Sequence, residues 1–218
     1  MKDTEIHAAI RILRRATRAW TTPYVTQLAR GHKDPFHILI STMLSLRTKD
    51  AVTAQASNRL FALADTPAAM VRLSPRAIEK AIYPVGFYRV KARNILSVCR
   101  ELLERPGSRV PDDIDALVAL PGVGRKTANL VVTLGFGKPG ICVDTHVHRI
   151  TNRWGYVRTR KPEQTEMALR AKLPRAYWIE INDELVAFGQ NLCHPTSPRC
   201  SVCPLIKYCD RVGVCHRR

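Results

Sequence analysis

A lysine and an aspartate close to a glycine-rich turn are the residues best suited to covalent chemistry. Lys126 lies within the segment LPGVGRKTAN, residues 120–129, and Asp144 follows in the string CVDTH. A lysine amine can act as a nucleophile, and a carboxylate can stabilise positive charge or manage protons. Each has a simpler interpretation. Lys126 beside Arg125 would suit a phosphate contact, and Asp144 would suit the cap of a helix that begins near Thr145.

Four cysteines near the end of the chain could bind a metal centre. They are separated by six, two and five residues: Cys193, Cys200, Cys203 and Cys209. Zinc is the generic interpretation of four cysteine ligands in a DNA-binding protein, and an iron–sulfur cluster is the alternative. The chain has seven cysteines, and this odd number, without a secretory signal, argues against a disulfide framework. We interpret Cys99 and Cys142 as small buried residues and Cys215 as a free thiol.

The glycines of residues 120–129 suggest how this segment could hold a phosphate. Gly122 and Gly124 stand two positions apart, directly before a predicted helix. Glycine allows backbone angles that other residues resist, and it permits a close approach to a ligand. The first amides of a helix have no partner within the helix and attract anions. An ordinary tight turn between two helices remains the alternative.

Three motifs together resemble one known family. The segment at residues 120–129, the string VDTHVHR at 143–149 and the four cysteines resemble, in order and spacing, the endonuclease III family of DNA glycosylases, of the helix-hairpin-helix-GPD superfamily. The resemblance covers nearly the whole chain, from Met43 to the last cysteines. It implies an all-α, two-domain helix-hairpin-helix fold with a C-terminal four-cysteine iron–sulfur loop.

The resemblance also implies roles for individual residues. Lys126 would attack C1′ of the damaged nucleotide, and the resulting Schiff base would permit β-elimination on the 3′ side. Asp144 would be the catalytic carboxylate. The four cysteines would bind a [4Fe-4S] cluster and fix a basic loop against the phosphate backbone. The implied DNA contacts within the motifs are Gly122, Val123, Gly124, Arg125 and His146.

Two further loops correspond to those that enter DNA when a nucleotide is flipped out of the duplex. They span residues 45–50 and 86–88, and they depart from the family pattern at one position each. Arg47 stands where glutamine is usual, and Phe87 stands where leucine is common. Arginine can hydrogen-bond an orphaned base and phenylalanine can stack as a wedge. We expect the departures to affect lesion and opposite-base preference, and not the reaction class.

The composition agrees with a nucleic-acid partner. The formal net charge is +17, from 35 Lys and Arg against 18 Asp and Glu. Such a field favours a polyanion, although a basic but inert protein, such as a ribosome-associated one, would share it. The sequence has no long apolar run and no signal-peptide core. We therefore expect a cytoplasmic, nucleoid-associated monomer that acts on double-stranded DNA containing a damaged base or an abasic site.

The elements that must position these residues are predicted to be helices, because apolar residues recur at helical spacing and no strand pattern appears. Predicted starts or spans are Asp34-Pro35, residues 50–63, Ser74-Pro75, residues 90–103 and residues 112–120. We expect a six-helix domain over 28–138, and a discontinuous domain from 1–27 and 139–218 that carries the cluster loop. A DNA cleft would separate them, with Lys126 and Asp144 facing each other.

Three functions are compatible with these observations. The leading one is a bifunctional DNA glycosylase and AP lyase of base excision repair, acting on oxidised pyrimidines. The second is a mismatch or other-lesion glycosylase of the same fold with weak lyase activity, which the departure at Arg47 keeps open. The third is a non-catalytic DNA-binding module that uses the hairpin alone. A protein that only binds DNA would not need both Lys126 and Asp144, so the presence of the two residues together argues against this third function.

Overall fold

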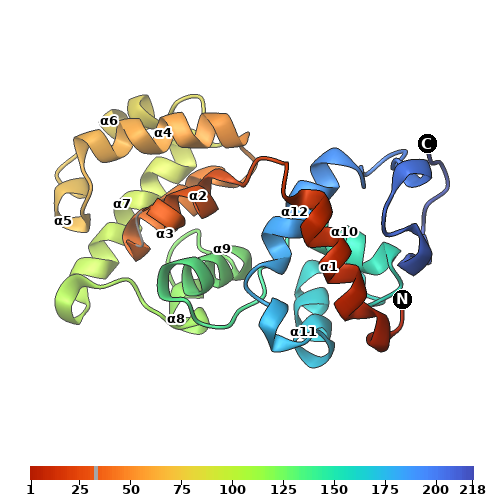
Figure 1. The fold of residues 1–218 in the computed structure, drawn as a ribbon. Helices are drawn as coiled ribbons and strands as arrows, with labels where there is room; N and C mark the ends of the chain where they lie inside the picture. The colour runs from red at the N-terminus through yellow and green to blue at the C-terminus, as the bar shows by residue number, and fades with distance from the viewer. Residues whose placement is uncertain (32–33) are drawn as a thin grey trace. The chain divides into compact units, whose positions relative to one another are not determined.

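The computed structural model describes residues 1–31 and 34–218, and its regular elements there are all helices (Figure 1). The predicted all-α class is thus confirmed. Residues 32 and 33, which fall within the expected 28–138 domain, lie outside the described residues. In the described part of the chain, no helix is long and apolar enough to cross a membrane.

The chain forms two units, each with its own apolar core. One unit is Tyr24–Lys138, and the other combines Met1–Pro23 with Pro139–Arg218. The first boundary therefore lies before Tyr24 and not after residue 27. The reason is that Tyr24 begins helix α2, Tyr24–Gly31, which packs against helices of the middle unit. A boundary after residue 27 would divide this helix.

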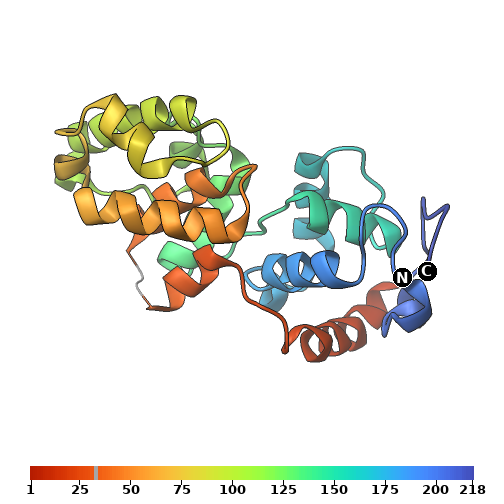
Figure 2. The ribbon, with the colours of Figure 1, turned by 90° about the horizontal axis from the view of Figure 1, so that it is seen from above.

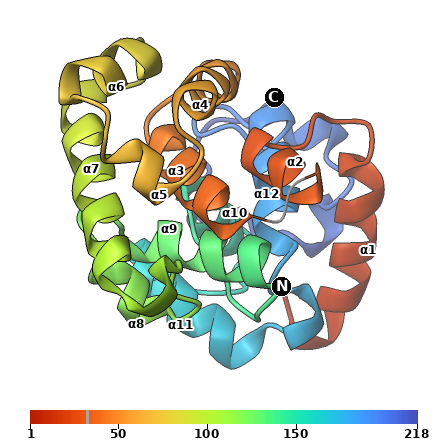
Figure 3. The ribbon, with the colours of Figure 1, turned by 90° about the vertical axis from the view of Figure 1, so that its left-hand side faces the viewer.

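Helix α3, Pro35–Ser45, is the centre of the middle unit. Its residues Phe36 and 38–44 are all buried, and it contacts α2, α4, α7 and α9 (Figures 1 and 3). The other helices are α4 (Asp50–Leu63), α5 (Pro67–Met70), α6 (Pro75–Ile82), α7 (Tyr88–Glu104), α8 (Ile114–Val118) and α9 (Arg125–Leu130), which continues as the π-helical turn η3 (Val131–Gly135). The described part of this unit thus has more than the six helices expected, because α2 and the single-turn α5 add to them; Thr66 and Pro67 mark the start of α5 as Ser74 and Pro75 mark that of α6.

Local capping signals explain where several of these helices begin. The side chain of Asp34 accepts a hydrogen bond from the Phe36 amide at 2.8 Å, and Pro35 occupies the first turn. Ser74 caps α6 in the same way, again followed by proline. Such residues satisfy amides that lack a partner within the helix. The predicted helix over 50–63 is found as α4 with the same bounds.

Cys99 lies in the core of the middle unit. It is 0% exposed, and burial raises the pKa of its thiol to about 12. Because the charged thiolate is so disfavoured there, Cys99 acts as a small apolar residue. The interpretation made from the sequence is confirmed for Cys99, and Cys142 is likewise buried.

The discontinuous unit packs an N-terminal helix against the C-terminal third of the chain. Helix α1 (Ile6–Thr17) contacts α12 (Ile181–Asn191), which also packs on α10 (Thr145–Arg153), and α10 contacts α11 (Pro162–Lys172) (Figure 2). Ile10 and Leu13 of α1 share one core with Val147, Leu185 and Phe188. Apolar residues separated by long stretches of sequence therefore hold this unit together.

Candidate active site

The glycine-rich turn joins α8 to α9. Gly122 has a φ of 74°, in the left-handed region that glycine tolerates best. A Cβ atom at Gly122 would collide with the side-chain amide of Asn94 on α7. Gly124 differs: its φ is −95°, and a Cβ atom there would meet nothing within 4 Å. The first glycine is required by the fold, whereas the second leaves open space beside the start of α9.

Val123 anchors this turn to the core. Its side chain is 5% exposed, and its amide donates to the Leu120 carbonyl at 3.1 Å. Neither group is therefore presented to a ligand. The structure shows that the side chain and the amide of Val123 anchor the turn, and the DNA contact expected at Val123 stays a prediction.

Lys126 lies in the first turn of α9, and its side chain is half-buried. The following residues, 127–130, are buried, so α9 presents only its first turn to the surface. The guanidinium of Arg125 lies 3.9 Å from the carboxylate of Asp115 on α8. The packing of residues 127–130 in the core thus fixes the helix backbone at Lys126, and Arg125 provides a second cation beside it.

Asp144 caps helix α10. Its Oδ1 accepts hydrogen bonds from the amides of His146 and Val147 at 2.8 and 2.9 Å. The capping interpretation is therefore confirmed. It is compatible with a chemical role, because the cap fixes the orientation of a half-buried carboxylate.

His146 belongs to a tightly packed contact between α10 and α12. Its Nδ1 lies 3.1 Å from Nη2 of Arg149, and a Cβ atom at Gly189 of α12 would collide with the imidazole. Arg149 also donates to the Cys193 carbonyl at 2.8 Å, and burial lowers the pKa of Arg149. His146 is thus held within a chain of contacts that leads to the cysteine segment.

The four predicted metal-ligating cysteines line one pocket. Trp154, Phe188, Leu192 and Ile206 are among its apolar walls, and the thiols are Cys193, Cys200, Cys203 and Cys209. The pKa of the Cys203 thiol is raised to about 11, mainly by burial and to a smaller extent by the other three thiols. Within residues 1–31 and 34–218, no three Cys, His, Asp or Glu side chains form a group that could hold a single metal ion.

A buried arginine organises the first part of this cysteine segment. Arg153 is 8% exposed, and its guanidinium donates to Cys193 Sγ at 3.3 Å and to the carbonyls of His194 and Pro195 at 2.6 Å each. Its own carbonyl accepts from Cys209 Sγ at 3.4 Å. One residue of α10 thus contacts both ends of the cysteine array.

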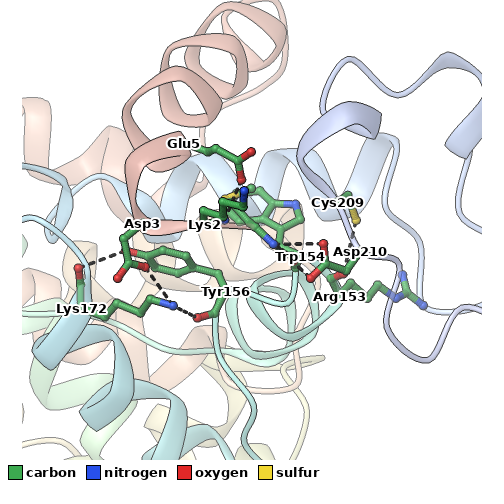
Figure 4. A network of polar contacts seen from close by, with 10 residues as sticks. Lys2, Asp3, Glu5, Arg153, Trp154, Tyr156, Lys172, Cys209 and Asp210 are labelled. Atoms are coloured by element: carbon green, nitrogen blue, oxygen red, sulfur yellow. Dashed lines mark hydrogen bonds and ion pairs between the residues drawn. The ribbon is translucent and has the colours of Figure 1, made fainter.

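Polar contacts around Arg153 and Trp154 join this loop to the rest of its unit (Figure 4). The Met1 ammonium donates to the Trp154 carbonyl at 2.7 Å and pairs with Asp210 at 3.0 Å. Lys172 pairs with Asp3 at 2.9 Å and donates to the Tyr156 carbonyl at 2.8 Å. The Met1 contacts hold Asp210, which follows Cys209, beside the end of α10, and the Lys172 contacts tie Asp3 to Tyr156.

Arg47 and Phe87 meet in the middle unit. Both side chains are exposed, and the Arg47 guanidinium carbon lies 5.5 Å from the centre of the Phe87 ring. Both residues have a positive φ, of 54° and 59°. Side chains from two loops distant in the sequence are thus brought together by the fold.

Three residues that support the site were missed from the sequence. Asn94 faces Gly122, Arg153 organises the cysteine segment, and Lys91 is buried beneath the Arg47 loop. Lys91 and Arg153 lie in helices with other cations, such as Arg89 and Arg149, and residue type alone does not indicate which cation is buried. The one signal in the sequence that could indicate which cation is buried is its position relative to the apolar stripe of the helix.

Comparisons with known proteins give a consistent family. A family model described as HhH-GPD superfamily base excision DNA repair protein matches residues 40–175. Endonuclease III of Thermotoga maritima is 48% identical over 188 residues, which are 85% of this chain and 88% of that protein. Endonuclease III of Escherichia coli is 39% identical over 176 residues, covering 81% and 83%. A solved structure of a trapped covalent intermediate of endonuclease III with DNA has a TM-score of 0.86 at 34% identity, covering 97% of both chains.

The two glycines of the turn give a matched pair of variants. We predict that Gly122→Ala lowers the free energy of unfolding by about 1–3 kcal/mol, because the alanine would hold a positive φ and press on Asn94. Gly124→Ala should change it by less than about 0.5 kcal/mol. Urea unfolding of both variants measures this difference. Equal stability of the two variants would contradict the constraint assigned to Gly122.

Proposed function

Because the chain belongs to the HhH-GPD superfamily of base excision DNA repair proteins, within the endonuclease III family, we propose that it removes oxidised pyrimidines from double-stranded DNA through Lys126. It is a DNA glycosylase with AP lyase activity. The observation that carries the residue assignment is the position of Lys126, at the partly exposed start of a helix whose remaining residues are buried.

Lys126 is the proposed nucleophile. Its amine, once neutral, attacks C1′ of the damaged nucleotide, and the glycosidic bond breaks so that the base leaves with the bonding electrons and takes up a proton. Opening of the sugar ring then gives a Schiff base between C1′ and the lysine nitrogen. Loss of a proton from C2′ expels the 3′ phosphate, which completes the β-elimination. A trapped covalent complex of the related endonuclease III supports a covalent step of this kind.

Asp144 is the proposed carboxylate of the reaction. Positive charge develops on the sugar as the base departs, and a fixed carboxylate stabilises that charge without reorganising. Its orientation is fixed because Oδ1 accepts from two helix amides. Asp144 can also receive a proton when the nucleophile loses one.

The start of α9 is the proposed phosphate contact. Gly124 and Arg125 present a helix start and a cation, and the open space at Gly124 admits the DNA backbone. His146 is the proposed contact from α10. The net charge of +17 favours the polyanionic partner over long distances. The protein is proposed to act on DNA as a monomer associated with the nucleoid.

The cysteine-lined pocket is the proposed site of a [4Fe-4S] cluster. Four thiols around one apolar-walled space fit such a cluster, which takes one cysteine thiolate at each iron. The bound cluster would supply a rigid crosslink between distant parts of the segment. Arg199, Lys207 and Arg211 are exposed around it, and they are the cations that the segment would hold toward phosphate.

Arg47 and Phe87 are the residues proposed to influence which lesion the protein prefers. Their exposed and adjacent side chains support a role in filling the space left by a flipped nucleotide. Arginine in this position offers only hydrogen-bond donors to an orphaned base, whereas glutamine offers both donors and an acceptor. A mismatch or other-lesion specificity is the second candidate, and excision from a panel of lesions opposite each base separates the two.

We predict that borohydride traps a covalent adduct between the wild-type protein and abasic-site DNA, and that Lys126→Ala abolishes it, because the Schiff base requires this amine. Denaturing gel electrophoresis measures the adduct. Lys80→Met is the matched control, since it removes an exposed cation of the same unit and should leave the adduct intact. Absence of an adduct with the wild type would refute the lyase assignment.

We predict that Asp144→Asn lowers the rate of base excision by about 10²–10⁴-fold while the protein keeps its stability. Asparagine caps helices as well as aspartate does, so this variant removes the charge and not the cap. Asp144→Ala removes both and should cost about 1 kcal/mol in addition. Single-turnover kinetics and thermal unfolding together measure the two effects. Full activity of the asparagine variant would assign Asp144 to capping alone.

We predict that the purified protein is brown, and that it contains iron and acid-labile sulfide in equal amounts. Cys203→Ala should lose the colour and unfold at lower temperature. Cys215→Ser, whose exposed thiol does not line the pocket, should keep both. Visible absorbance and metal analysis check this prediction. A colourless protein containing zinc would overturn it.

A further inference from the structure

Two turns of the middle unit are built so that Arg47 and Phe87 meet. Residues 45–48 form a turn in which the Thr48 amide donates to the Ser45 carbonyl at 3.1 Å, with Arg47 at a position that glycine usually takes. In the second turn the Tyr88 amide donates to the Val85 carbonyl at 3.1 Å. Non-glycine residues with a positive φ are uncommon, and they persist where their surroundings enforce them.

The two turns touch through their backbones. A Cβ atom at Gly86 would lie 2.6 Å from the Arg47 carbonyl oxygen, so only glycine allows this approach. The Gly86 amide donates to Thr48 Oγ1 at 3.2 Å, and that hydroxyl donates to the Leu46 carbonyl at 3.2 Å. The Arg47 turn and the Phe87 turn are therefore joined by a close backbone contact and a hydrogen bond.

A buried ammonium lies beneath this contact. Lys91 of α7 is 8% exposed, and its Nζ donates to the carbonyls of Leu44 and Leu46 at 2.8 and 2.6 Å and approaches Thr48 Oγ1 at 3.3 Å. All three ammonium donors thus have an acceptor. Burial lowers the pKa of Lys91 to about 8, so the group still carries its charge at neutral pH. The carbonyls lie at the C-terminal end of α3, where a helix favours a cation.

The same lysine is joined to the second turn through the backbone. The Lys91 amide donates to the Phe87 carbonyl at 3.0 Å, within the first turn of α7. The side chain of Lys91 therefore holds the Arg47 turn while its backbone holds the Phe87 turn.

We propose that Lys91 is a positioning residue that holds Arg47 and Phe87 as one preformed wedge for opening the duplex. The inference rests on the proposed function, in which these two side chains enter DNA. A wedge that is already assembled loses little conformational entropy on insertion, so its effect falls on the flipping of a paired nucleotide. The lyase chemistry of Lys126 on an unpaired abasic site does not require it.

The test compares two substrates in single-turnover experiments with the full-length protein. One is a duplex that contains thymine glycol, and the other is a single-stranded oligonucleotide that contains an abasic site. Lys91→Met should lower the excision rate on the duplex by about tenfold or more and change the lyase rate on the single strand by less than about twofold. Lys80→Met, the control from the same unit, should change neither rate.

A milder variant covers the case in which Lys91→Met does not fold. Thr48→Val keeps the shape of the side chain and removes the hydroxyl that joins Gly86 to Leu46. It should lower the duplex rate by about threefold or more and leave the single-strand rate within about twofold. Equal losses on the two substrates, or no loss on either, would overturn the proposal.

A double-mutant cycle provides a readout that a merely structural role would not change. Phe87→Ala should cost about tenfold on the duplex in the wild-type background but less than about twofold in the Lys91→Met background, because the wedge is already disassembled there, and about threefold in the Thr48→Val background, where the wedge is only weakened. Additive losses would refute the coupling. If the proposed function is wrong, the wild type will form no adduct with the single-stranded abasic substrate. This result is distinct from the outcomes above, and it would refute the inference together with the proposed function.

Discussion

The burial of α3 on all sides is the constraint on which the middle unit depends. A helix that is apolar around most of its circumference must be covered by other helices, and α2, α4, α7 and α9 cover it. Two of these neighbours carry functional segments: α7 begins just after Phe87, and α9 begins just before Lys126. Close packing around α3 therefore fixes both segments without any direct contact to the chemistry.

Each unit uses a buried cation to fix a loop. In the middle unit the ammonium of Lys91 binds carbonyls at the end of α3, and in the other unit the guanidinium of Arg153 binds carbonyls beside Cys193. Loops have few apolar contacts of their own. Hydrogen bonds from several loop carbonyls to one central cation stabilise them instead. A cation buried in this way is held only if its donors are satisfied, which makes the loop geometry specific.

Local signals in the sequence were sufficient for several helix starts, whereas the roles proposed for Lys126 and Asp144 rest on the family resemblance. Asp34-Pro35 and Ser74-Pro75 mark helix starts through chemistry that acts within a few residues, and Asp144 was recognised as a cap for the same reason. Other features depend on packing between distant segments. The burial of Val123, for example, follows from the core beneath the turn.

Residue type was also insufficient where the fold decides between equivalent candidates. Helix α7 offers Arg89, Lys91 and Arg93, and only the second of these is buried. The adjacency of Arg47 and Phe87 depends on the close approach at Gly86, which joins turns that are distant in the sequence. Long-range contacts of this kind leave no local pattern, so they emerge only once the helices are packed.

The discontinuous unit has a consequence for how the chain folds during its synthesis. Helix α1 is made before the middle unit, but its apolar face, with Ile10 and Leu13, packs on α12, which is made after that unit. The middle unit is contiguous, so it can form while α1 still waits for its partner. Helix α1 therefore stays without its packing partner until α12 has been made, and the long loop that joins them closes after the middle core can already assemble.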